Sequence, residues 1–152
     1  LLETPPRILR PGIISRQQLE ALIGPLAQGS SAAVPRVPGS TPQHYAPQTP
    51  VELVAADALE ARIESSNASG DAVVVLARRA PQTRLALACG AAPSHVRRWL
   101  QAPMSAVDYA HDLYANLRTL DKESAARILI EQVPAGPEWD AVRDRLGRAA
   151  AR

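Results

Sequence analysis

The hydrophobic pattern divides the chain into a short amphipathic segment, a stretch without periodicity and a longer region in which strands and helices alternate. In residues 13–24, Ser15 and Gln18 have the spacing of a helix capping box. Gly24 can adopt the left-handed conformation that ends many helices. The apolar stripe between them consists of Leu19, Leu22 and Ile23. The pattern predicts a helix of about two turns, which is too short to be stable unless it packs on another element.

Residues 25–50 have no hydrophobic periodicity and are rich in proline, glycine, serine and alanine. This composition is typical of a linker. Its six prolines are Pro25, Pro35, Pro38, Pro42, Pro47 and Pro50. Because proline-rich linkers are stiff and extended, we expect this one to follow a fixed path along a surface. It carries His44 and Tyr45 on a stretch that can form neither a helix nor a strand interior.

From residue 51 onward the pattern indicates strands alternating with helices. The β-branched run 51–54 and the apolar run 72–77 predict two strands, and the second has the continuous apolar character of a strand buried on both faces. Between them, Asp57 and Glu60 are expected to cap a helix over 58–66. Together these elements have the pattern of one βαβ unit.

Two further short strands are predicted at 83–88 and 96–103. A helix then begins at Ser105, with Asp108 in the capping position, and runs to about Lys122. Its apolar face is expected to hold Val107, Ala110, Leu113, Tyr114, Leu117 and Leu120.

The last part of the chain predicts a buried strand at 127–133 and a final helix that begins near Pro137. The inward residues of that helix are expected to be Trp139, Val142, Leu146 and Ala150. Alternating strands and helices with apolar strands predict an α/β fold, with an open, mostly parallel, Rossmann-like sheet and helices on both faces. A short strand, turn and helix in residues 1–24 and the extended linker precede this fold.

Composition limits the class of protein. A chain of 152 residues with 46% apolar content can bury one ordinary core. The single cysteine, Cys89, excludes an internal disulfide and a CxxC metal site, and fits a reducing compartment. No apolar run approaches the roughly 18 residues that a membrane span needs, and the N-terminus lacks the order of a signal peptide. We therefore expect a soluble, cytoplasmic protein with no membrane partner.

The formal net charge of +2 is a mild excess, and the basic residues are spread along the chain. Sixteen of the seventeen basic residues are arginine, which fits coding bias as well as phosphate recognition. We therefore expect no direct binding of nucleic acid.

Chemical motifs are absent from residues 51–152. Open parallel sheets bind ligands at the carboxyl ends of their strands, but no GxGxxG, GxxxxGK[ST] or GxSxG motif occurs there. His95 and His111 have no partner at metal-ligand spacing except Asp108 and Asp112, which fit a solvated helix face. The aromatic residues, interpreted as core or rim, are Trp99, Tyr109, Tyr114 and Trp139. We predict no catalytic residue and no metal site here, and interpret the region as a binding or regulatory module.

Three stretches, in order, resemble the C-terminal part of two-domain threonylcarbamoyl-AMP synthase, whose catalytic domain is YrdC-like. They are ILRPGIISRQQLEALIG (8–24), HYAPQTPVELV (44–54) and YAHDLYANLRTLDKESAARILIEQVPAGPEWDAVRDRLGRAA (109–150). The resemblance covers nearly the whole chain, and its most specific parts are the HYAP linker motif and the ending. Residues 55–100 are generic in this comparison.

The resemblance implies a division of the chain and a reaction. Residues 1–24 would end the catalytic domain, 25–50 would link the domains, and 51–152 would form the C-terminal α/β domain. The catalytic domain makes threonylcarbamoyl-adenylate from L-threonine, bicarbonate and ATP, with Mg²⁺ expected and pyrophosphate released. No cofactor is expected to bind tightly. The product serves the threonylcarbamoylation of tRNA. Because the catalytic domain would lie upstream of residue 1, the chain by itself is expected to be inactive.

The resemblance also implies site residues. Arg10 matches the arginine of the family's LRPG motif and Tyr45 the tyrosine of HYAP, and both are expected to contact ATP. A guanidinium suits phosphate, and a phenol offers a flat apolar face with one hydroxyl. His44 is expected to anchor the linker or to contact a phosphate. On a stiff linker, Tyr45 could close over the nucleotide site as a lid that excludes water. Many relatives have a methionine and a tyrosine where this chain has Ser40 and Pro42, which leaves the linker path there open.

A second interpretation is a stand-alone α/β module that docks on a separate catalytic subunit or senses a small ligand. The two interpretations differ in what they imply for residues 1–24. As the end of a missing catalytic domain, these residues would expose an unpaired strand and an apolar helix face, and close packing of 1–24 on 51–152 would count against that interpretation.

Overall fold

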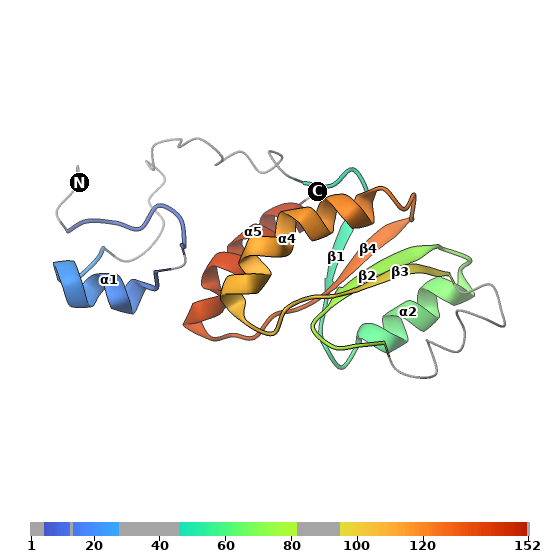
Figure 1. Cartoon of the computed structure of the whole chain (residues 1–152), viewed down its shortest axis with the longest axis horizontal. Helices are drawn as coiled ribbons and strands as arrows, with labels where there is room; N and C mark the ends of the chain where they lie inside the picture. The colour runs from blue at the N-terminus through green and yellow to red at the C-terminus, as the bar shows by residue number, and fades with distance from the viewer. Residues whose placement is uncertain (1–4, 13, 28–45, 82–94, 152) are drawn as a thin grey trace.

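The computed structural model describes residues 5–12, 14–27, 46–81 and 95–151 (Figure 1). Its elements are α1 (Arg16–Ile23), β1 (Val51–Val54), α2 (Leu59–Ala68), β2 (Val73–Ala77), β3 (Val96–Gln101), α4 (Ala106–Asp121), β4 (Arg127–Glu131), the 3₁₀ helix η1 (Pro137–Trp139) and α5 (Asp140–Ala150). In these ranges, every helix is too short or too polar to traverse a lipid bilayer.

The described strands form one parallel sheet in the order β1-β4-β2-β3. The last strand in the chain lies inside the sheet, where Leu129 of β4 is opposite Glu52 of β1 on one side and Val75 of β2 on the other. β4 therefore separates the two strands that the sequence assigned to one βαβ unit. The predicted open, parallel α/β sheet is confirmed.

Helices cover both faces of this sheet (Figure 1). Alternate residues of each strand point to opposite faces, so neighbouring residues of β2 enter different clusters. The cluster on the α2 face contains Val54, Leu59, Ile63, Val73, Val75, Ala77 and Leu129. The cluster under α4 and α5 includes Val74, Leu76, Leu113, Leu117, Ile128, Ile130, Val142 and Leu146. All five residues of β2 are buried because both sides of the sheet are covered.

Two predicted helix starts are confirmed at their caps. In α1, the Ser15 hydroxyl accepts the Gln18 N–H at 3.2 Å, and the Gln18 side chain accepts the Ser15 N–H at 2.8 Å. Gly24 ends this helix with φ of 82°, a conformation that favours glycine. In α4, the Ser105 hydroxyl accepts the Asp108 N–H.

The predicted cap of α2 is wrong. The helix begins at Leu59, and the residue before it, Ala58, already has near-helical dihedrals of −92° and −10°. The Ala58 N–H donates to the Ala55 carbonyl at 3.0 Å, which forms a turn directly before the helix. A capping side chain needs an extended residue at the N-cap. Asp57 therefore lies within the turn, and no side chain caps this end.

The prediction that Val107 lies on the apolar face of α4 is also wrong. Val107 is 54% exposed, whereas Tyr109 is 1% exposed. Two residues rotate the helix by about 200°, so Val107 and Tyr109 cannot both face the sheet. The rest of the face is confirmed, because Leu113, Leu117 and Leu120 are buried.

The segments that precede the sheet are only partly described. Residues 5–12 form neither helix nor strand, and the strand predicted at the start of the chain is not seen in them. The strand predicted at 83–88 lies outside the described residues.

Candidate functional site

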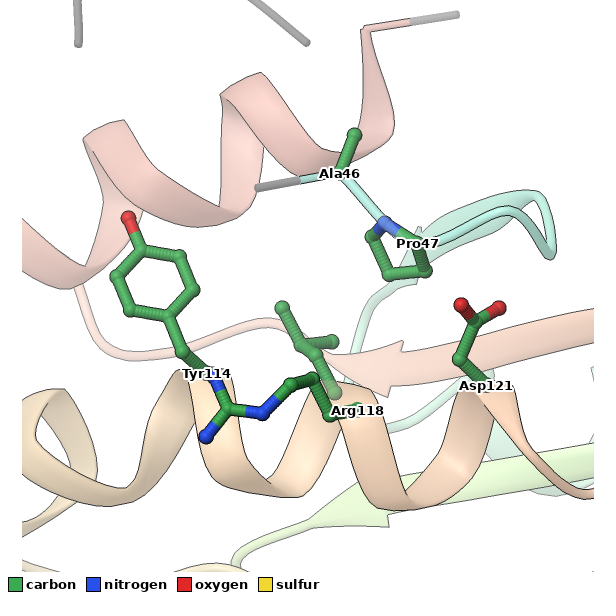
Figure 2. Close-up of a pocket in the computed structure, with 6 residues that line it drawn as sticks. Ala46, Pro47, Tyr114, Arg118 and Asp121 are labelled. Carbon is green, nitrogen blue, oxygen red and sulfur yellow. The ribbon is translucent and has the colours of Figure 1, made fainter. Parts of the chain in front are cut away.

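The end of the linker lies against α4 and forms one side of an open pocket of about 190 Å³ (Figure 2). The lining residues are Ala46 and Pro47 from the linker and Tyr114, Leu117, Arg118 and Asp121 from α4. In Figure 2, the side chains of Tyr114 and Asp121 point from α4 toward the side on which Ala46 and Pro47 lie.

Helical spacing brings the four α4 residues of this pocket together. Tyr114 precedes the other three by three, four and seven residues, which places all four along one stripe of the helix. Leu117 is buried and gives the pocket an apolar floor, Tyr114 is half-buried, and Arg118 is exposed. Within the described part of the chain, Arg118 makes no hydrogen bond or ion pair. Its guanidinium is therefore available to an anion.

The carboxylate of Asp121 fixes the linker end. The Gln48 N–H donates to its Oδ2 at 3.0 Å, and the Thr49 N–H donates to its Oδ1 at 2.8 Å. Pro47 and Pro50, on either side, have no N–H to donate. The Pro50 carbonyl accepts the N–H of Ile128 at 2.9 Å, so the chain is bound on α4 immediately before it enters the sheet.

Arg10 lies against the neighbouring helix. Its guanidinium is 3.9 Å from Oδ2 of Asp144 on α5, with 31% of the Arg10 side chain exposed. The same carboxylate accepts hydrogen bonds from Nε and Nη2 of Arg148, at 3.0 and 3.1 Å. This hydrogen bonding raises the pKa of Arg148, and the electrostatic interaction with Tyr114 raises it further. Asp144 thus connects the N-terminal segment to α5.

A second pocket, of about 190 Å³, lies between the N-terminal segment and the start of the last helical region. It is lined by Ile8, Pro11, Gly12, Ile14, Ser15, Arg16, Pro137 and Asp140. α1 itself buries no residue, and its Leu22 and Ile23 are 80% and 50% exposed. The apolar face expected for this helix is therefore open in the structure.

A buried polar group lies at the carboxyl edge of the sheet. Glu131, at the end of β4, is 4% exposed and accepts the Arg78 N–H at 2.7 Å. Tyr109 packs edge-on against Trp139 with ring centroids 5.7 Å apart, and the Arg78 guanidinium lies 5.4 Å from the Trp139 ring. Burial raises the pKa of Tyr109, and the charge of Glu131 raises it further.

The aromatic residues at this edge of the sheet belong to the core. The predicted core positions of Tyr109 and Trp139 are confirmed, since both are buried. The Tyr109 hydroxyl is buried without a hydrogen-bond partner among the described residues. In the described ranges no three His, Cys, Asp or Glu side chains are grouped to hold a metal ion. The sequence signal for Glu131 is an acidic residue at the end of a buried apolar run.

Of the residues expected to contact ATP, Arg10 is described, and it pairs with Asp144. His44 and Tyr45 lie outside the described residues, immediately before Ala46. Sequence reasoning missed Asp121, because the backbone groups that it binds are 72 and 73 residues away. Its one sequence signal is a carboxylate at a helix C-terminus, where the helix dipole is unfavourable to negative charge.

Comparisons with known proteins show the family through a sequence model and the fold through a solved structure. The sequence model for "Threonylcarbamoyl-AMP synthase, C-terminal domain" matches residues 14–151. No curated protein matches the chain. A solved structure of P. abyssi Sua5, in a variant with an adjacent histidine and tyrosine both changed to alanine, is similar with a TM-score of 0.73 and 24% identity. The match covers 99% of this chain and 43% of the P. abyssi chain, so this chain spans less than half of that relative. The chain belongs to the family of threonylcarbamoyl-AMP synthase C-terminal domains.

Proposed function

We propose that this chain is the C-terminal part of a threonylcarbamoyl-AMP synthase and works with a YrdC-like catalytic domain. The reaction would convert L-threonine, bicarbonate and ATP, with Mg²⁺, to threonylcarbamoyl-adenylate and pyrophosphate, and the product would serve tRNA modification. The family match over residues 14–151 carries this proposal. We propose that Mg²⁺ accompanies ATP in the full-length enzyme.

In this proposal the linker is a lid over the nucleotide, and Tyr45 is the residue that reaches it. Threonylcarbamoyl-adenylate is a mixed anhydride, so excluding water protects it from hydrolysis. The anchoring of Gln48 and Thr49 supports this role, because a lid needs a fixed end from which to close. The P. abyssi variant removes an adjacent histidine and tyrosine, and this chain carries such a pair at His44 and Tyr45.

Arg10 is proposed to contact a phosphate of ATP. It would have to exchange its contact with Asp144 for the phosphate. The ion pair with Asp144, at 3.9 Å between partly exposed side chains, contributes at most about 1 kcal/mol to the cost of this exchange. His44 is proposed as a phosphate contact or as a further anchor of the linker.

A stand-alone module that docks on a separate catalytic subunit is the second candidate. The exposed Leu22 and Ile23 on α1 favour it as much as they favour a catalytic domain in the same chain, because both would cover that face. The reading frame upstream of Leu1 separates the two. A continuation into a YrdC-like sequence supports the first candidate, and a start codon at that point supports the second.

The proposed function is tested by pyrophosphate release. The 152-residue chain, incubated with ATP, Mg²⁺, L-threonine and bicarbonate, is expected to release none above a blank without protein. The same chain joined to its upstream catalytic domain is expected to release pyrophosphate only when threonine is present. Pyrophosphate release by the 152-residue chain alone would contradict the proposal that the catalytic domain carries the reaction. A full-length protein that releases no pyrophosphate would overturn the proposed function.

A further inference from the structure

We propose that Asp121 is a positioning residue, which holds the linker end (residues 46–50) on the C-terminal end of α4 and so sets how far the preceding HYAP residues can reach. This inference rests on the proposed function for its catalytic consequence. The anchoring itself rests on the described residues alone.

The first argument is that the two backbone N–H groups between Pro47 and Pro50 both donate to one side chain. Between Pro47 and Pro50, only Gln48 and Thr49 have a backbone N–H. Each donates to a different oxygen of the Asp121 carboxylate, at 3.0 and 2.8 Å. Hydrogen bonds to an ionised acceptor are roughly twice as strong as neutral ones. A single side chain therefore fixes two successive peptide groups.

The second argument is the place of Asp121 on the helix. It is the last residue of α4, where unpaired carbonyl groups give the helix a partial negative charge. A carboxylate at this position is unfavourable for the helix. The two N–H groups of the linker offset that cost, which points to a role in holding the linker rather than in stabilising α4.

The third argument is chain length. An extended chain spans at most about 3.6 Å per residue, so the Cα atom of Tyr45 lies within about 11 Å of the Cα atom of Gln48. As long as Asp121 holds Gln48, covalent geometry keeps the Cα atom of Tyr45 within that distance of the Gln48 Cα atom. Without Asp121 the nearest fixed point is Pro50, whose carbonyl accepts the Ile128 N–H, so the chain before it would gain two residues of reach.

Amide hydrogen exchange tests the anchor in the full chain. In Asp121→Ala we expect the Gln48 and Thr49 amides to exchange about tenfold faster or more, because each loses a charge-assisted hydrogen bond. Asp121→Asn keeps the shape but loses the charge and one acceptor, and it serves if the alanine variant does not fold. Asp112→Ala is the matched control, since Asp112 lies about 13 Å along the helix and half a turn away. Unchanged exchange at both amides in the Asp121 variants would overturn the proposal.

ATP kinetics test the consequence in the full-length protein. In Asp121→Asn we expect the KM for ATP to rise about fivefold or more, with a smaller change in kcat and a melting temperature near the wild-type value. Asp112→Ala should keep the wild-type KM. Faster amide exchange with an unchanged KM would show that Asp121 is only structural, and would overturn its role as a positioning residue. If the wild-type protein does not use ATP at all, the proposed function fails, and amide exchange then decides the anchor by itself.

Discussion

Glu52 shows how single charged residues stabilise the sheet. Its carboxylate accepts Nε and Nη2 of Arg62 on α2 at 2.7 and 2.9 Å, and Arg127 of β4 lies 3.9 Å away. The hydrogen bond from Arg62 holds the pKa of Glu52 below its ordinary value of 4.5, burial opposes this shift, and the charges of Arg62 and Arg127 add to it. Because the pKa is lower in the folded state, the contribution to stability is present above pH 4.5 and is lost as the pH falls through the folded pKa.

Glu52→Gln is therefore expected to lower the free energy of unfolding by about 0.5 to 1 kcal/mol at pH 7. The difference from wild type should shrink toward zero below the ordinary glutamate pKa. Urea unfolding at pH 7 and at about pH 3.5 measures both values. Glu64→Gln, an exposed change on α2, should have no effect at either pH. An effect of Glu52→Gln that is as large at low pH as at pH 7 would contradict this assignment.

Single residues also show which contacts could be predicted from the sequence. Ser15 and Ser105 were predicted correctly as caps, because their partners lie three residues away. The prediction that Asp57 caps α2 was wrong, because the turn closed by the hydrogen bond between Ala58 and Ala55 forms there in place of the cap. The role of Asp121 was not predictable, because its partners come close only when the whole domain is folded.

At the scale of elements, apolar runs identified β2 and β4, because strands covered on both faces need continuous apolar sequence, and a β-branched run identified β1. The runs do not specify which strands are neighbours. The central position of β4 follows from how α2 and α4 cover opposite faces, which is a property of the assembled sheet. The pattern likewise predicted the α4 helix, but not on which side of it Val107 lies.

The two faces of α4 can be compared with a matched pair of substitutions. Leu113→Ala is expected to cost about 3 kcal/mol of unfolding free energy, because the side chain is fully buried and leaves a cavity. Val107→Ala should cost less than about 0.5 kcal/mol, because Val107 is 54% exposed. Chemical denaturation of both variants measures the difference. Equal losses of unfolding free energy in the two variants would contradict the assignment of Leu113 to the buried face of α4 and Val107 to the exposed face.

At the scale of the whole molecule, the two segments that precede the sheet are both bound to the helices on one face. Arg10 contacts Asp144 of α5, and the linker end is held by Asp121 of α4 (Figure 1). These are also the segments whose motifs imply contact with ATP. We infer that the C-terminal domain supports the linker, while the proposed chemistry would belong to the catalytic domain.

The most direct test of this account is the affinity of the full-length protein for ATP. Arg10→Ala and Tyr45→Ala should each weaken binding about tenfold or more, because each removes a proposed contact to the nucleotide. Arg97→Ala is the control, since that side chain binds the Glu123 carbonyl at the exposed edge of the sheet. Isothermal titration of the three variants and wild type gives the four affinities. Weaker binding in the first two variants alone is the predicted result, and wild-type affinity in both would contradict the account.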